Sequence, residues 1–313
     1  MQVLGIDVGG TKIEAATIVG SRALDSTETP TPLDDGAALI DGLAFLARKV
    51  IERDGEPGAI GIGLPSQIDF ATGTVVASVN IPLEGVSLRE ELEHRFGLPV
   101  YVDNDANVAA LAEAQLVDGG PARHVLMLTL GTGVGGGVVI DGKVFRGSSG
   151  LGAELGHMVI EADGLKCPGR NCPNHGCLEA YCSGSALERA AGMPGEEVEA
   201  RARAGDREAQ KHLDDLGRWL GVGIANFVNI FEPEHIVIGG GLGASAADLF
   251  LETAIAEARS RALPAGFERV RFSLAKGGSH AGVIGAGVMA QKEHMLASGE
   301  RDTAHTTTLG GDG

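Results

Sequence analysis

LGIDVGGTKIEAATIV at residues 4–19 and LMLTLGTGVGGGVVI at residues 126–140 follow one pattern. Each begins with an apolar run, passes through a segment rich in glycine and threonine, and returns to apolar residues. Such a pattern predicts two antiparallel strands joined by a hairpin turn. In the second copy we expect the turn over 131–137 and the return strand over 138–145. The pattern occurs once in each half of the 313-residue chain, so the sequence predicts a duplicated domain.

Strand and helix patterns alternate after each of these hairpins. Strands alternating with helices predict an α/β fold in which a mainly parallel sheet is covered by helices. The expected strands are 59–64, 100–103, 235–241 and 269–275, and the expected helices are 37–53, 87–96, 108–116, 218–231, 246–261 and 281–295. Residues 297–313 contain almost no large apolar side chain, which predicts a disordered tail.

Composition narrows the class of protein. A formal charge of −17 argues against a nucleic-acid partner, because phosphate backbones are bound by basic surfaces. No apolar stretch is long enough to span a membrane, and the N-terminus enters a strand pattern directly, so we expect neither a membrane segment nor a signal peptide. All four cysteines lie in one segment, which favours a metal site in the reducing cytoplasm over a set of disulfides.

The first hairpin turn carries groups suited to an anion. Gly9 and Gly10 leave backbone N–H groups free to face a phosphate, and Thr11 and Lys12 add donors. Asp7, at the end of the strand, is suited to hold Mg²⁺ through water. An ordinary glycine β-turn is the alternative. The second turn, with Thr132 and Gly133, repeats the chemistry, and two such turns facing across a cleft would clamp one polyphosphate.

Two further segments allow both a structural and a functional interpretation. DNDAN at residues 103–107 lies between a strand and a helix, where Asn and Asp cap helices. A carboxylate at the carboxyl end of a strand in an α/β sheet also lies where ligands bind. IVIGGGLG at residues 236–243 is a strand followed by glycines, which fits either a nucleotide or close strand–helix packing.

The cysteine segment predicts a zinc site. Cys167, Cys172, Cys177 and Cys182 are evenly spaced, and His157 lies ten residues before the first of them. Tetrahedral zinc takes four ligands, so a Cys₃His and a Cys₄ site compete, and either would be closed and structural. Cys182 lies in a short predicted helix and is alternatively a small buried residue. Metal-free thiols are the remaining alternative.

The segments DVGGTK, DNDAN, GTGVGGG, ELGH and GCLE occur in this order, and the set resembles the ROK family of sugar kinases and repressors. The likeness covers residues 3–295 and is strongest to bacterial members that phosphorylate glucose with ATP. It implies the duplicated, actin-like ATPase (ribonuclease H-like) fold, with two lobes and a cleft between them. We expect one lobe over 1–118, joined by a helix over about 281–296, and a second lobe over 119–280 that carries the zinc loop.

The resemblance also implies roles for particular residues. Asp105 matches the base that takes the proton from the sugar 6-hydroxyl. The implied sugar ligands are Asn80, Asn104, Asp105, Glu154, His157 and Glu179. The implied ATP-site residues are Asp7, Gly9, Gly10, Thr11, Lys12, Thr132, Gly133, Gly239, Gly240 and Gly241, with Asp7 near Mg²⁺. The implied zinc ligands are His157, Cys167, Cys172 and Cys177, with His157 binding zinc through one nitrogen and sugar through the other.

Two departures from the family pattern leave alternatives open. The family's cysteines follow CxCGxxGC, whereas CPGRNCPNHGC here keeps Cys182 in the competition for zinc. The family's Pro-Gly pair is Pro65-Ser66 in this chain. Other candidate acceptors are N-acetylmannosamine, fructose and mannose, and polyphosphate is an alternative donor. A sugar-sensing repressor is disfavoured because the phosphate loop begins at Asp7, ahead of which a DNA-binding helix-turn-helix would have to fit. Relatives imply a homodimer or homotetramer.

Overall fold

The computed structural model describes residues 1–78, 80–169 and 171–299. These residues form two compact units, one of Ala109–Ala281 and one of Met1–Val108 with the residues from Gly282 on. The last helix, α10 (Ala281–Ser298), includes two residues that were predicted to belong to the tail. It continues that far because the next helix-terminating residue is Gly299, in the left-handed region at φ 74°. The rest of the predicted tail, from 300 on, lies outside the described residues.

The first unit is built on a six-stranded sheet of order β3-β2-β1-β5-β8, with β4 pairing with β2. β1 runs antiparallel to β2 and parallel to β5, which in turn is parallel to β8. A separate hairpin, β6-β7, was not predicted. The elements are β1 (Gln2–Val8), β2 (Lys12–Val19), β3 (Arg22–Ala23), β4 (Thr27–Pro30), α1 (Gly36–Asp54), β5 (Ile60–Leu64), β6 (Ser66–Asp69), β7 (Thr74–Ser78), α2 (Leu88–Phe96) and β8 (Val100–Asn104).

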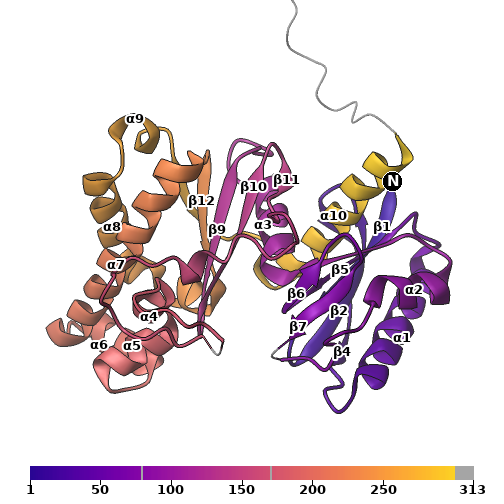
Figure 1. Ribbon diagram of the computed structural model, residues 1–313, viewed down its shortest axis with the longest axis horizontal. Coiled ribbons are helices and arrows are strands. Elements are labelled where there is room, and N and C mark those ends of the chain that lie inside the picture. Colours follow the sequence, from indigo (N-terminus) through magenta and orange to yellow (C-terminus); the bar gives the residue numbers. More distant parts are fainter. Residues whose placement is uncertain (79, 170, 300–313) are drawn as a thin grey trace, which may run out of the picture. The chain divides into compact units, whose positions relative to one another are not determined.

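Alternate residues of β1 face opposite sides of this sheet, as the period of a strand requires. Leu4 and Ile6 join the core formed with α1, whereas Val3 packs in a separate cluster with α10. Figure 1 shows α1 and α2 on one side of the sheet and α10 on the other. Gly5 and Gly61 allow this close approach of α10, because a Cβ on either would clash with its backbone. Asp7 shares the α10 face of β1.

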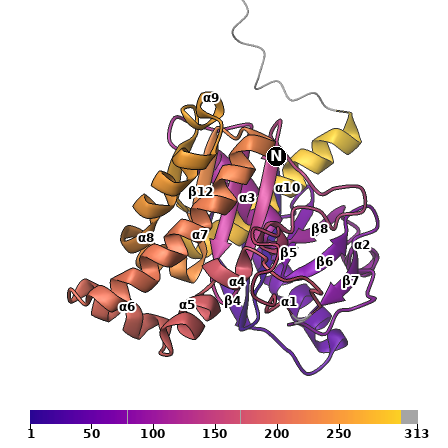
Figure 2. The ribbon, with the colours of Figure 1, turned by 60° about the vertical axis from the view of Figure 1, so that its left-hand side comes forward.

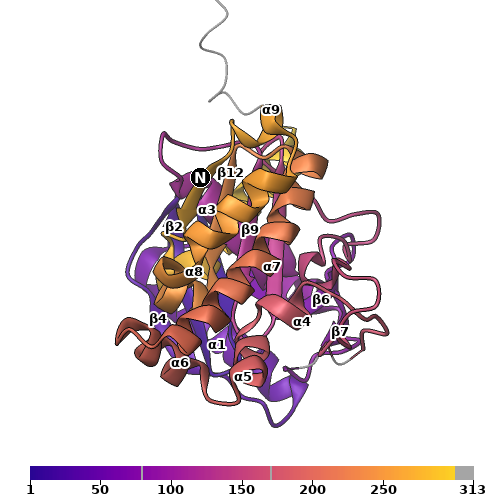
Figure 3. The same ribbon diagram turned by 90° about the vertical axis from the view of Figure 1, so that its left-hand side faces the viewer.

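The second unit repeats this plan with a five-stranded sheet of order β11-β10-β9-β12-β13. An antiparallel meander is again followed by two parallel strands, which confirms the predicted duplication. α7 and α8 cover one face of the sheet (Figure 3). α3 (Asp105–Leu116) begins in the first unit and ends in the second. The other elements of the second unit are β9 (Val125–Leu130), β10 (Val134–Ile140), β11 (Lys143–Val144), η1 (Leu155–His157), α4 (Glu179–Cys182), α5 (Gly184–Ala191), α6 (Gly195–Arg203), α7 (Arg207–Phe231), β12 (His235–Gly239), α8 (Gly240–Arg261), α9 (Pro264–Phe267), β13 (Arg271–Leu274) and η2 (Gly278–His280).

Several predicted boundaries in this part of the chain are wrong. The turn after β9 is only Gly131–Gly133, and the next three glycines belong to β10. α7 begins at Arg207 and not at 218, because Asp206 caps it with bonds to Glu208 and Ala209 N–H groups. α8 begins at Gly240, directly after β12, and α3 begins at Asp105. The helices α5 and α6 were not predicted, and they follow α4 alongside α7 (Figure 2).

Across the described residues, no helix is both long and apolar enough to cross a membrane.

Candidate active site and metal centre

The first predicted phosphate turn is a braced hairpin in the first unit. Gly9 N–H donates to the carbonyl of Lys12 at 2.9 Å, and the hydroxyl of Thr31 donates to the carbonyl of Gly9 at 2.7 Å. The ammonium of Lys12 is paired with Glu28 on β4. A Cβ on Gly10 would meet no atom of the residues that the structure describes within 4 Å, so the tip of the turn is open with respect to them. The geometry therefore offers an accessible backbone to an anion, beside an ammonium group that is paired with Glu28.

Asp7 has an unusual electrostatic environment at the end of β1. Burial, together with the negative charges of Asp105 and Glu14, raises the pKa of Asp7 to about 7, and the charge of Lys12 opposes this rise. Glu14 lies directly opposite Asp7 in the β1–β2 register. Gly282 of α10 has no room for a Cβ because the Asp7 carboxyl group fills that space. A bound cation is the group that would relieve such a crowded carboxylate, which suits a magnesium site.

The capping interpretation of residues 103–107 is confirmed, and the ligand-binding interpretation stays a prediction. Asn104 caps α3, its Oδ1 accepting the N–H groups of Ala106 at 2.9 Å and Asn107 at 3.4 Å. The buried Asp103 accepts from the Asn104 N–H at 2.7 Å and from the Asn107 amide at 2.9 Å. Asp105 is the first helical residue, and its charge acts on Asp7. The structure thus brings the predicted base and the predicted magnesium carboxylate into one electrostatic environment.

Ser66, where the family resemblance implied glycine, accepts a bond from Asn104 through its backbone. The backbone carbonyl of Ser66 accepts a hydrogen bond from the Asn104 side-chain amide at 3.2 Å. The hydroxyl of Ser66 donates a hydrogen bond to the hydroxyl of Ser78 at 2.9 Å. Asn80, two residues after Ser78, lies in an exposed bend. The serine side chain therefore adds a bond within the β6–β7 hairpin, whereas the bond to Asn104 uses the backbone and would be open to glycine as well.

In the second unit the two predicted nucleotide segments lie side by side. Gly131 N–H donates to the carbonyl of Gly133 at 3.0 Å, which closes the turn between β9 and β10. Gly240 has φ +80°, and a Cβ there would clash with Leu130, the residue before this turn. Gly239 pairs with Thr129 in the parallel register, so α8 begins beside the turn. A helix N-terminus after a parallel strand is a common site for phosphate groups.

The predicted sugar residues of this unit lie on two short helices or, for Glu154, directly before one. Glu154 is at the centre of a tight turn with φ −72° and ψ 64°, and Leu155 N–H donates to the carbonyl of Ala153 at 2.8 Å. Ala153 itself has φ 65°, a strained conformation for a residue with a side chain. Glu179 begins α4, and its Oε2 accepts the N–H of Val134 at 2.9 Å. The start of α4 is thus bonded to Val134 at the start of β10, and Gly156 of η1 packs against the carbonyl of the same residue.

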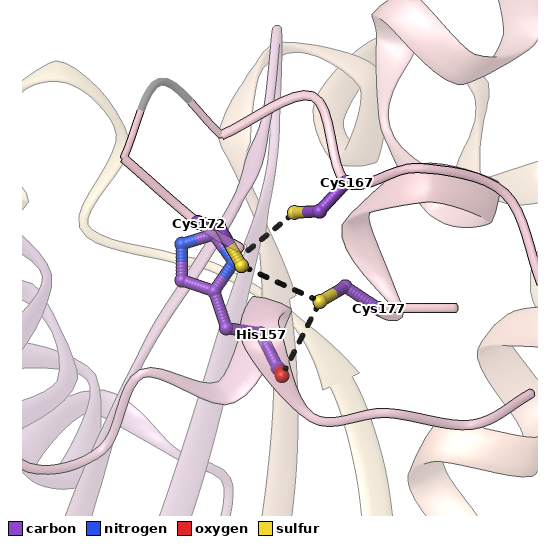
Figure 4. A group of neighbouring side chains, drawn as sticks. All are labelled: His157, Cys167, Cys172 and Cys177. Atoms are coloured by element: carbon purple, nitrogen blue, oxygen red, sulfur yellow. Dashed lines mark hydrogen bonds between the residues drawn. The ribbon is translucent and has the colours of Figure 1, made fainter. Parts of the chain in front are cut away.

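Four zinc-binding side chains come together in the loop between η1 and α4. One ligand atom from each of His157, Cys167, Cys172 and Cys177 lies within 4.8 Å of the others, and Figure 4 shows the side chains pointing toward one another. The Sγ atoms of Cys172 and Cys177 are 3.8 Å apart, and Nδ1 of His157 is 3.4 Å from Sγ of Cys167. Tetrahedral zinc with bonds of about 2.0–2.3 Å places its ligands at about these separations. The donor set therefore fits zinc, with His157 Nδ1 as the ligand atom.

Cys182 lies apart from this cluster. It is fully buried in the hydrophobic core of the second unit, where its thiol contacts the carbonyl of Leu216 at 3.8 Å. Burial raises the pKa of the Cys182 thiol well above its usual value. The structure brings His157, and not Cys182, to the three other cysteines.

Tyr181 is a supporting residue that the sequence did not indicate. Its hydroxyl accepts the N–H of Leu165, in the zinc loop, at 2.8 Å. Its ring packs against Trp219 of α7 with centroids 4.4 Å apart. Tyr181 thus connects the zinc loop to the helical layer. Nothing in its sequence position marks it, because both contacts come from segments distant along the chain.

Two folded units with the same sheet plan, each carrying a glycine turn, and a His-Cys₃ cluster define the actin-like ATPase fold with a zinc motif. A family model described as "ROK family" matches residues 3–293. The chain belongs to the ROK family, and it is a sugar kinase of that family.

Curated relatives agree on the class but differ in the sugar named. A glucokinase of Halalkalibacterium halodurans is 36% identical, with 95% of this chain and 97% of the relative covered. An N-acetyl-D-glucosamine kinase of Aliivibrio salmonicida is 39% identical over 76% of this chain and 83% of its own.

Solved structures support the fold over nearly the whole chain. The ROK hexokinase of Thermus thermophilus has a TM-score of 0.87 at 37% identity, covering 95% of this chain and 100% of that one. The ROK glucokinase of Streptomyces griseus, in complex with glucose and AMPPNP, has a TM-score of 0.74 at 32% identity, covering 93% and 100%.

Proposed function

We propose that this protein is a cytoplasmic hexose kinase that transfers the γ-phosphoryl group of ATP to the 6-hydroxyl of glucose. The observation that carries the proposal is the glucokinase from H. halodurans, which matches the chain almost from end to end. The motifs DNDAN, ELGH and GCLE support it, because they supply Asp105, Asn104, Glu154, His157 and Glu179 as the candidate sugar-site residues. The S. griseus relative, in complex with glucose and AMPPNP, supports ATP as the donor.

In this proposal, Asp105 is the general base. Phosphoryl transfer needs a carboxylate within reach of the attacking hydroxyl, in-line positioning and neutralisation of the phosphate charge. The Asn104 cap and the Asp103–Asn107 bond fix the start of α3, and so fix the backbone of Asp105. Gly9–Lys12 and Thr132-Gly133 donate to the phosphates, and Gly239–Gly241 lie near the nucleoside. Glu154, His157, Glu179 and Asn80 orient the sugar through its hydroxyl groups.

Two metal ions complete the proposed enzyme. Asp7 would hold Mg²⁺ through water, and this ion neutralises phosphate charge when it is bound. His157, Cys167, Cys172 and Cys177 would hold one structural zinc. With Nδ1 of His157 directed at the cysteines, Nε2 is the ring nitrogen left for a sugar hydroxyl. Zinc would therefore set the direction in which this imidazole points.

The base assignment is tested with Asp105→Asn. The substitution keeps the size of the side chain but removes its ability to take a proton. We expect hexose binding to stay within about threefold of wild type and kcat to fall at least 10²-fold, the range for loss of general-base catalysis. A kcat within tenfold of wild type rejects Asp105 as the base.

The acceptor and the donor are tested by a single screen. Glucose, N-acetylglucosamine, N-acetylmannosamine, fructose and mannose are each offered with ATP and with polyphosphate, and kcat/KM is compared. N-acetylglucosamine has specific support from the A. salmonicida relative. We expect glucose with ATP to give the highest kcat/KM. Activity on another sugar alone removes the glucose proposal and leaves the kinase proposal intact.

The metal and the assembly are tested independently of activity. Metal analysis should find about one zinc per chain, and Cys172→Ala should lose it. Cys182→Ala is the matched control, since Cys182 lies in the core, and it should retain zinc. Loss of zinc in Cys182→Ala contradicts the His-Cys₃ site.

We further propose that the protein is a homodimer or homotetramer. A monomeric mass measured by light scattering refutes this proposal.

A further inference from the structure

Glu179 contacts the second phosphate turn directly. Its Oε2 accepts the N–H of Val134, the residue that follows the turn, at 2.9 Å. Two residues after α4, the N–H of Gly184 donates to the carbonyl of Gly131, the first residue of the turn, at 2.7 Å. The segment that carries a proposed sugar ligand is therefore bonded to both ends of a proposed phosphate turn.

The two glycines of this turn differ in their surroundings. A Cβ on Gly133 would lie well inside 3.0 Å of Glu179 Oε2, a separation that real side chains do not show. Among the described residues, a Cβ on Gly131 would meet no atom within 4 Å. Neither glycine has a left-handed φ, so the requirement for glycine at position 133 comes from the Glu179 carboxylate and not from the backbone conformation.

Val134 also contacts the other helix that carries proposed sugar ligands. Gly156, in the middle of η1 between Glu154 and His157, approaches the carbonyl of Val134 so closely that a Cβ on Gly156 would overlap it. The N–H of Val134 is bonded to Glu179 and its carbonyl packs against Gly156. One residue next to the phosphate turn thus sets the position of both sugar-binding segments of this unit.

We propose that the Glu179 carboxylate is shared between the two substrates, with one oxygen holding the phosphate turn through Val134 and the other binding a sugar hydroxyl. A carboxylate has two oxygens and about four acceptor positions, so a single bond to Val134 leaves capacity for the sugar. Its bond to a backbone N–H is charge-assisted and correspondingly strong. The turn at Gly131–Gly133 then positions the sugar ligand as well as the phosphate. This inference rests on the proposed function, because it takes Glu179 as a sugar ligand.

The consequence is that a change in the phosphate turn alters sugar affinity when no nucleotide is present. Gly133→Ala places a methyl group against Glu179 Oε2 and displaces the carboxylate, whereas Gly131→Ala is the matched control in the same turn. With the hexose that the wild type phosphorylates, we expect Gly133→Ala to raise the calorimetric Kd at least tenfold. Gly131→Ala should stay within twofold of wild type. Melting temperature and zinc content confirm that each variant is folded.

A double-mutant cycle tests whether the effect passes through Glu179. Glu179→Ala weakens hexose binding by itself and removes the carboxylate that the new methyl group strikes. Adding Gly133→Ala to Glu179→Ala should therefore change the Kd by less than twofold. The inference is overturned if Gly133→Ala alone leaves the Kd within twofold of wild type, if Gly131→Ala weakens binding equally, or if the two effects are additive.

A reciprocal measurement covers the case in which Gly133→Ala does not fold. Glu179→Gln keeps an amide oxygen that can accept the Val134 N–H, and Glu179→Ala keeps none. Without sugar, Glu179→Ala should bind AMPPNP at least fivefold more weakly than wild type, and Glu179→Gln should restore binding to within twofold. Equal affinities in all three proteins overturn the inference. If wild type binds and phosphorylates no hexose, the proposed function itself fails, an outcome separate from any difference among variants.

Discussion

Replacing Asp7 with asparagine should make the protein more stable at neutral and alkaline pH while abolishing turnover. Burial and the nearby charges of Asp105 and Glu14 raise the pKa of Asp7 from 3.8 to about 7. The native state therefore binds this proton more tightly than the unfolded state does. The stability linked to Asp7 is fully present below the unfolded pKa and is lost as the pH rises through about 7.

The size of the effect follows from this difference in pKa. A rise from 3.8 to about 7 corresponds, at about 1.4 kcal/mol per pH unit, to an upper limit of about 4 kcal/mol. Asp7 is partly exposed, so solvent screening reduces the effect, and we expect a gain on the order of 2 kcal/mol for Asp7→Asn above pH 7. At about pH 4 the gain should largely disappear, because the wild-type carboxyl is then protonated.

The assay is thermal unfolding by calorimetry across this pH range, in buffer without magnesium or nucleotide. Asp34→Asn, in an exposed bend before α1, is the matched control for removing one negative charge, and it should leave the Tm unchanged within about 1 °C. A gain in Tm that is independent of pH, or no gain above pH 7, refutes the reasoning. Kinase activity measured on the same samples should fall at least 10²-fold, because the substitution that stabilises the fold removes the carboxylate proposed to hold Mg²⁺.

Three further outcomes are expected from packing and charge. Burial is the main cause that lowers the pKa of His235, so the native state binds the imidazole proton less tightly than the unfolded state does. The free energy of unfolding should therefore fall as the pH drops below 6.5. His235→Leu should flatten the profile of Tm against pH in that range. Trp219, the only tryptophan in the chain, packs against Tyr181, so removal of zinc by a chelator should change the fluorescence emission of Trp219. Tyr181→Phe lacks the hydroxyl bonded to the zinc loop and should reduce that change at least by half. Gly61→Ala overpacks the sheet against α10 and should lower the Tm by about 3–10 °C, from a cost of about 1–3 kcal/mol.

Local sequence patterns determined the fold class and the duplication. The apolar runs around residues 9–11 and 131–133 became β1–β2 and β9–β10, and each hairpin starts a sheet of the same plan. These predictions succeed because strand periodicity and turn chemistry act between residues close in sequence. The boundaries failed where tertiary packing decided them. Gly135–Gly137 looked like a turn, but Gly136 is a strand residue that gives room to Leu155.

The sequence by itself also indicated a metal site from the spacing of its cysteines, and the nature of its ligands from their chemistry. It did not decide between His157 and Cys182, since both lie at plausible distances along the chain. The fold decides, because α4 directs Cys182 into the core while η1 carries His157 to the other three cysteines. The link from Glu179 to Val134 is likewise tertiary: it joins residues 45 apart in sequence, and only the folding of the loop onto β10 brings them into contact.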